Sequence, residues 1–140
     1  MKAGFISLHR YKIFISLFVA YSLGLLYLTV YPRLHVPIVP SGISADKLAH
    51  SAQFFIFSCL YTCIRIYPLR FKDKGARKAK LDRDVCIELF LLGALVSSFT
   101  ESLQIRIPGR SFCWYDMCAN LLGFYLFIIC YKLFRKVRKV

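Results

Sequence analysis

Acidic residues are scarce in this sequence: seven Asp and Glu stand against 20 Lys and Arg, and the formal net charge is +13. The six cysteines include no paired CxxC motif, which excludes the common zinc and thiol redox motifs. There is also no phosphate-binding loop, no nucleophile elbow and no internal repeat. These absences leave a single domain over residues 1–140 without a recognised enzyme motif.

Apolar residues dominate instead. They make up 58% of the 140 residues, and the mean hydropathy is +0.55. The remaining polar residues are too few to cover an apolar core of this size in water. The composition therefore predicts a membrane protein. All six cysteines lie in or beside apolar runs, so we interpret them as small buried hydrophobic residues rather than a disulfide framework.

The apolar residues fall into runs that predict four membrane spans, at about residues 13–31, 47–64, 85–105 and 112–134. A cleaved signal peptide is the alternative for the first run. That run is longer than the roughly 7 to 15 apolar residues of a signal peptide, and Tyr-Pro-Arg follows it instead of a small-residue cleavage site. The predicted fold is all-α, a polytopic membrane four-helix bundle.

Basic residues predict the orientation of these spans. Sixteen of the 20 Lys and Arg lie before the first span, between the second and third, or at the end of the fourth. The positive-inside bias therefore predicts that both termini are cytoplasmic. Residues 65–83 carry eight of these cations, and we expect a solvated loop against anionic headgroups. Nucleic acid is not an expected partner, because the cations are not interleaved with aromatics as base stacking requires.

Polar residues recur four and seven positions apart in three of the predicted spans, so each set shares one helix face. The three sets are Asp46, His50 and Gln53; Ser97, Glu101 and Gln104; and Asp116, Asn120 and Gly123. Gly123 is expected to let another backbone approach closely. With the predicted topology, all three faces meet at the outer side and form a polar pocket that Arg106 and Arg110 could roof.

Ionisable residues within membrane spans indicate a functional site by default. The candidates for catalysis are His50, Glu101 and Asp116, since a histidine near carboxylates can act as a general acid or base. The candidate ligand-binding set is Asp46, Lys47, His50, Gln53, Glu101, Gln104, Arg110, Asp116 and Asn120. For the uncharged members Gln53, Ser97 and Asn120, hydrogen bonding between helices is an equal alternative.

No cofactor is expected. A metal held by His50, Glu101, Asp116 and Cys113 is possible by ligand type, but the spacing matches no known metal motif. We therefore predict no metal. Arg65 and Glu88 lie near the cytoplasmic ends of neighbouring spans, where an ordinary ion pair or snorkelling of the long side chains explains them.

Three blocks of the sequence resemble the VanZ-like family of small bacterial membrane proteins. They are DKLAHSAQFF at 46–55, ESLQ at 101–104 and PGRSFCWYDMCANLLG at 108–123, and they look like the family's Asp-Lys-x-x-His, Glu-x-x-Gln, Pro-Gly-Arg and Asp-x-x-x-Asn-x-x-Gly signatures. The resemblance covers about residues 40–130. Cys113 departs from it, because the family often has an acidic residue there.

The resemblance implies a multi-pass protein of the bacterial cell membrane, and its namesake is associated with resistance to the glycopeptide teicoplanin. We therefore expect an envelope protein whose outer pocket binds membrane lipids or a lipid-linked cell-wall precursor. The alternatives are a membrane enzyme that acts on a lipid-linked substrate with His, Glu and Asp as acid and base, and a helix-bundle partner without a ligand. A transporter is disfavoured, because four spans without broken helices leave little room for alternating access. The oligomeric state stays open.

Overall fold

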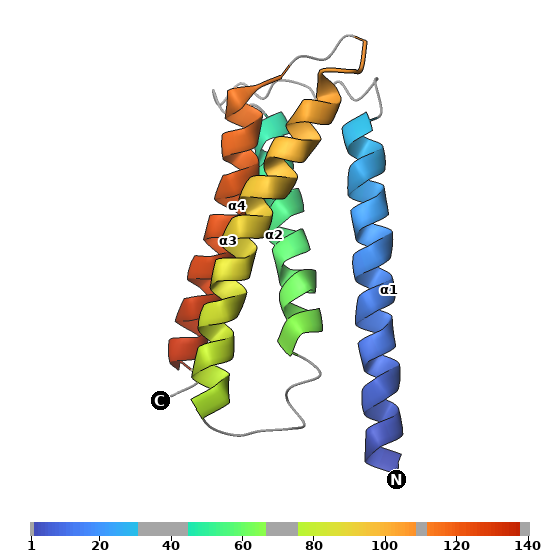
Figure 1. The fold of residues 1–140 in the computed structure, drawn as a ribbon, viewed down its shortest axis with the longest axis vertical. Helices are drawn as coiled ribbons and strands as arrows, with labels where there is room; N and C mark the ends of the chain where they lie inside the picture. Colours follow the sequence, from blue (N-terminus) through green and yellow to red (C-terminus); the bar gives the residue numbers. More distant parts are fainter. Residues whose placement is uncertain (1, 31–44, 67–75, 109–111, 138–140) are drawn as a thin grey trace.

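The computed structural model describes residues 2–30, 45–66, 76–108 and 112–137, which form four helices (Figure 1). Their bounds are α1 Lys2–Val30, α2 Ala45–Ile66, α3 Ala76–Gln104 and α4 Trp114–Val137. The helices run alternately up and down, so both chain ends lie at the same end of the bundle (Figure 1). The predicted all-α four-helix bundle is confirmed, and the cytoplasmic placement of its termini stays a prediction.

Two helices begin earlier than the hydropathy pattern predicted. Helix α1 starts at Lys2 instead of residue 13, and α3 starts at Ala76 instead of residue 85. The expectation of a loop over residues 65–83 is therefore wrong for residues 65–66, which end α2, and for residues 76–83, which begin α3. Ala, Lys, Arg and Leu fill most of this stretch, and all four have high helix propensity. A helix boundary follows this propensity, whereas hydropathy marks only the part suited to a membrane.

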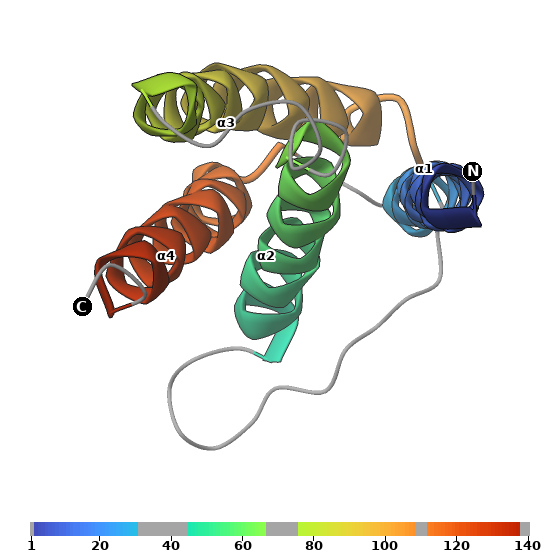
Figure 2. The same cartoon turned by 90° about the horizontal axis from the view of Figure 1, so that it is seen from below.

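Within the described residues, three helices are long and apolar enough to cross a membrane: Tyr11–Val30, Arg83–Gln104 and Trp114–Val137. Helix α2 is not among them, because its first three turns hold Asp46, Lys47, His50 and Gln53. It lies between the other helices when the bundle is viewed along its axis (Figure 2), and it packs against all three. The predicted second span is thus a central helix whose polar residues are partly shielded by apolar neighbours.

The burial pattern of α2 explains how a polar helix can belong to a membrane bundle. Its exposed positions include Leu48, Ala52, Ile56 and Cys59, which are apolar or weakly polar. Its polar side faces inward instead, which reverses the pattern of a helix on a water-soluble protein. Helix α2 therefore presents an apolar surface outward while bringing polar groups to the interior.

Aromatic side chains form the middle of the core. Phe54 is 1% exposed, and its ring centroid lies 5.3 Å from that of Phe124 on α4. Phe57 packs edge-on against the same Phe124 ring at 5.9 Å and lies 5.0 Å from Phe18 of α1. These pairs link α1, α2 and α4, and ring contacts of this kind contribute about 0.5–1.5 kcal/mol each beyond area burial.

An ion pair joins α2 and α3 near the end of the bundle that holds the termini. The Arg65 guanidinium donates to both carboxylate oxygens of Glu88, with Nε 2.7 Å from Oε2. The Tyr61 hydroxyl donates to the same Oε2 at 2.9 Å. The ion pair predicted for these residues is confirmed, and its bidentate geometry is the stronger form of an Arg–carboxylate contact.

Candidate functional site

The first turn of α2 is joined to the first turn of α4 by a charge pair. Lys47 Nζ donates to Asp116 Oδ1 at 3.2 Å. The Lys47 side chain is 37% exposed and that of Asp116 is 12% exposed, so the pair lies at the margin of the bundle. A pair this open adds little net stability, and its main effect is to hold a carboxylate at the helix end.

The position of Asp116 follows from how α4 begins. The carbonyl of Cys113 accepts the backbone N–H groups of Asp116 and Met117 at 3.1 and 3.2 Å, and helix α4 starts directly after Cys113 at Trp114. Asp116 is then the third helical residue, where a negative charge is favoured by the helix dipole. The start of α4 therefore fixes this carboxylate at the N-terminal end of the helix.

One turn deeper, His50 of α2 meets Asn120 of α4. Its Nδ1 lies 3.0 Å from Asn120 Oδ1, and its Nε2 lies 3.7 Å from Asp46 Oδ1. Because the amide oxygen only accepts, Nδ1 carries the hydrogen and donates it. In the neutral imidazole, Nε2 then holds a lone pair toward Asp46, and it can accept a proton or bind a donor.

Gly123 sets how closely α2 and α4 approach. A Cβ added at this residue would overlap the carbonyl oxygen of Ser51 and would lie 3.0 Å from the backbone nitrogen of Phe55. The two helices run parallel here, because Lys47, His50 and Ser51 meet successively later residues of α4. The predicted close backbone approach at Gly123 is confirmed, and it is what allows the two polar faces to touch.

Helix α3 adds a third set of buried polar groups. Ser97 and Glu101 are both 0% exposed and Gln104 is 4% exposed. Thr100, which the sequence reasoning missed, is also buried, and its hydroxyl donates to the Ser97 carbonyl at 3.0 Å. Its position directly before Glu101 could have indicated that it belongs to the site. Threonine is common in apolar spans and carries no charge, so this indication is weak.

The register between α3 and α4 brings this set to the same depth as the α2–α4 contacts. The helices are antiparallel, and Ser98 Oγ lies 4.0 Å from Met117 Sδ. Counting from that contact places Ser97 within one turn of Asn120 and Glu101 near the start of α4. We call the polar groups at this end of the bundle the polar cluster. Its described members are Asp46, Lys47, His50, Ser97, Glu101, Gln104, Asp116 and Asn120.

Three sequence candidates are not placed in the polar cluster by the described residues. Gln53 meets α1 through its backbone, whose carbonyl accepts the Tyr21 hydroxyl at 2.8 Å. Arg106 is exposed beyond the end of α3, and Arg110 lies outside the described residues. The role of every candidate in binding or catalysis stays a prediction.

Two atoms of the polar cluster are buried without a hydrogen-bond partner among the described residues. They are Asn120 Nδ2 and Ser97 Oγ, and both residues are 0% exposed. Leaving such a group unsatisfied costs about 1–3 kcal/mol, so native proteins nearly always supply a partner for it. Both atoms therefore remain available for a hydrogen bond that the described residues do not supply.

Three side chains of the cluster could hold a metal ion. One ligand atom from each of Asp46, His50 and Asp116 lies within 4.8 Å of the others. This group differs from the set considered from the sequence, because Asp46 takes the place of Glu101 and Cys113 in the described structure. Lys47 already places a positive charge on Asp116, and a divalent cation would have to displace it.

These features define a class: an all-helical membrane protein whose buried polar and charged side chains gather at one end of the bundle. The sequence model of the VanZ/LLP1 family matches residues 14–135, and the chain belongs to that family. The match confirms the resemblance seen in the motifs and extends it from residues 40–130 to residues 14–135, which include the second half of α1. No curated protein and no solved structure matches the chain.

Proposed function

We propose that this protein binds the hydroxyl- and amide-bearing headgroup of a lipid-linked envelope molecule at the polar cluster. The observation that carries the proposal is that one buried polar atom on each of Asn120 and Ser97 has no hydrogen-bond partner in the part of the chain that the structure describes. Hydroxyl and amide groups both offer acceptors for such atoms. A helix bundle held together only by leucines would avoid this desolvation penalty.

The charges of the cluster favour such a headgroup over a bare phosphate. Among the described members, three carboxylates (Asp46, Glu101 and Asp116) stand against one cation, Lys47, and a histidine. Carboxylates accept hydrogen bonds from sugar hydroxyls and peptide amides but repel phosphate oxygens. We expect Arg110, which the sequence singles out as an anion partner, to bind the phosphate that links the headgroup to its lipid.

Exposure within the cluster suggests a route of access. Side-chain exposure falls from 42% at Asp46 and 37% at Lys47 to 17% at His50, and Asn120 is fully buried. A headgroup would therefore approach from the end of the bundle and contact the deeper groups last. With the predicted topology this end faces outward in a bacterial cell membrane, and binding there would alter susceptibility to teicoplanin-type glycopeptides.

The sole tryptophan provides a test of binding. Trp114 lies two residues before Asp116 and is 66% exposed, so a bound headgroup would change its fluorescence. Titration in nanodiscs with a polyprenyl-diphosphate-linked disaccharide-peptide should give a saturable signal. Polyprenyl phosphate alone should bind more weakly because it lacks the glycan and the peptide.

Two variants at neighbouring serines distinguish a loss of headgroup binding at the polar cluster from a general effect of removing a serine hydroxyl from α3. Ser97→Ala removes a buried hydroxyl from the cluster, and we expect the dissociation constant to rise about 2- to 12-fold, the equivalent of one hydrogen bond. Ser98→Ala makes the same change at the next residue, which is exposed and bonds to its own helix at Ala94. Equal effects of the two variants, or no saturable signal in the wild type, would refute the proposed site.

A membrane enzyme is the second candidate, and the geometry of His50 favours it. Asn120 orients the imidazole through Nδ1, which leaves Nε2 able to exchange a proton with a substrate. If the protein is an enzyme, His50→Gln should reduce turnover of the same lipid-linked probe by about 100-fold or more while the Trp114 titration still saturates. Wild-type protein that binds the probe without converting it, as followed by mass spectrometry of the lipid, would exclude this candidate for that substrate.

A further inference from the structure

A second feature lies far from the polar cluster, between α3 and α4 near the end of the bundle that holds the termini. Here the two helices border an open groove of about 540 Å³. Its walls are mostly apolar, with Ile87, Phe90 and Leu91 from α3 and Tyr125 and Ile128 from α4. The groove is therefore a separate surface from the cluster that carries the proposed function.

The walls of the groove are suited to a hydrocarbon chain. Phe90, Leu91 and Tyr125 are 67%, 62% and 61% exposed, and they lie inside the membrane-spanning parts of α3 and α4. From Arg83 to Leu91 the groove follows α3 for about 12 Å, at 1.5 Å per residue. This length accommodates the part of one acyl chain that lies nearest the headgroup.

Two cations close one end of the groove. Arg83 is the first residue of the membrane-spanning part of α3, and Lys132 lies near the C-terminal end of the antiparallel α4. Both residues therefore lie at the same depth along the bundle axis. The Arg83 side chain is 72% exposed, and its Nε lies 3.8 Å from the carboxylate of Asp84. That contact is long and open to solvent, so a phosphate could compete with it.

We propose that this groove binds an anionic phospholipid of the surrounding leaflet, with the phosphate between Arg83 and Lys132 and one acyl chain along Phe90, Leu91 and Tyr125. Basic sites between membrane helices attract anionic headgroups, and the effect is strongest at the cytoplasmic leaflet. The distribution of Lys and Arg predicts that this end faces the cytoplasm. The cationic end and apolar walls of the groove thus complement the phosphate and the acyl chain of an anionic phospholipid.

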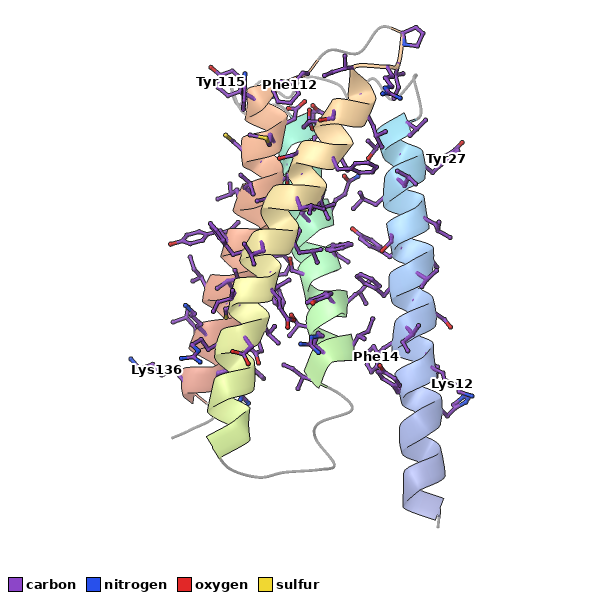
Figure 3. All side chains as sticks on the ribbon, viewed as in Figure 1. Lys12, Phe14, Tyr27, Phe112, Tyr115 and Lys136 are labelled. Atoms are coloured by element: carbon purple, nitrogen blue, oxygen red, sulfur yellow. The ribbon has the colours of Figure 1, made fainter. Side chains whose placement is uncertain are left out.

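Charge variants test the headgroup contact. The double variant Arg83→Gln/Lys132→Gln should bind phosphatidylglycerol about 10- to 30-fold more weakly in native mass spectrometry of the full chain released from mixed micelles. The control Lys12→Gln/Lys136→Gln removes the same charge from two exposed lysines at the same end, outside the groove lining (Figure 3). Equal losses in the two doubles would mean that the attraction is diffuse, and the groove would not be a lipid site.

A second pair of variants tests the acyl-chain contact without changing charge. Leu91→Trp should fill the groove and reduce retention of phosphatidylglycerol at least about 5-fold. Leu95→Trp places the same side chain one turn farther along α3, at a residue that is 68% exposed and outside the lining. Retention that is unaffected by Leu91→Trp, or phosphatidylcholine retained as well as phosphatidylglycerol, would overturn the proposal. The Trp114 titration is unaffected by these variants if the two sites are independent.

Discussion

Replacing Gly123 by alanine is expected to separate α2 from α4 and to destabilise the bundle more than the same change at Gly24 or Gly93. The new Cβ would overlap the Ser51 carbonyl oxygen and lie 3.0 Å from the Phe55 nitrogen. Both atoms belong to the backbone of a helix, so they cannot turn aside as a side chain would. Overpacking costs about 1–3 kcal/mol where side chains can adjust, and we expect a loss of unfolding free energy at or above the upper end of that range.

The same change should also disrupt the polar cluster. Lys47–Asp116 and His50–Asn120 both bridge α2 and α4, at 3.2 and 3.0 Å. Because the His50 contact lies within one turn of Gly123, a shift of about 1 Å there would break it. Headgroup binding should therefore fall together with stability in this variant.

Two other glycines supply graded controls for this measurement, which is thermal unfolding in detergent micelles. Gly24 has no atom within 4 Å of an added Cβ, and Gly24→Ala should be neutral or stabilising by up to about 1 kcal/mol through helix propensity. At Gly93 the added Cβ would lie 2.9 Å from the Phe124 ring, a side chain that can shift, so the effect should be intermediate. If Gly123→Ala unfolds at the same temperature as Gly24→Ala, α2 and α4 do not approach each other as closely as described.

Replacing Asn120 by leucine is expected to keep the fold and to weaken binding. Asn120 is 0% exposed, its Nδ2 has no partner among the described residues, and its Oδ1 accepts from His50. Leucine has a similar shape and removes the unsatisfied donor, which offsets the lost hydrogen bond. We expect the unfolding free energy to change by less than about 1 kcal/mol.

Binding of the lipid-linked disaccharide-peptide should nevertheless weaken about 10- to 100-fold in Asn120→Leu, since one contact to the headgroup and the orientation of His50 disappear together. The Trp114 titration measures this change, and thermal unfolding of the same sample measures stability. Cys118→Leu serves as the control, because Cys118 is exposed on the same helix two residues away. Unchanged binding in Asn120→Leu would show that the buried amide only joins helices, which is the alternative role considered for it.

Much of the site could be predicted from the sequence because the signals are local. The four- and seven-residue spacings place Glu101 with Ser97 and Asp116 with Asn120 on single helix faces, whatever the helices pack against. Glycine at residue 123 on a polar face likewise indicated a close contact, although not with which helix. The position of Asp116 at the start of α4 follows from the same local chemistry.

The early start of α3 shows the limit of hydropathy as a guide. Residues 76–83 are too basic to be read as part of a span, yet they continue the helix because helix propensity and apolar character are separate properties of a residue. The apolar run at 47–64 likewise predicted a span, yet α2 is not among the described helices apolar enough to cross a membrane, because polar residues occupy its first turns. Its inward polar face is compatible with the bundle only because neighbouring helices surround that face.

What the sequence determined by itself is therefore the all-helical class, the four segments, the polar faces and the family, since each depends on residues close together in the chain. Only the tertiary structure decided that α2 lies parallel to α4, that Lys47 meets Asp116 and His50 meets Asn120, and that a groove opens between α3 and α4. The reason is that these contacts depend on which helices become neighbours and in what register. Such pairings arise from the packing of whole helix surfaces, for which Gly123 and the Phe54–Phe124 contact are the main determinants on the α2–α4 side.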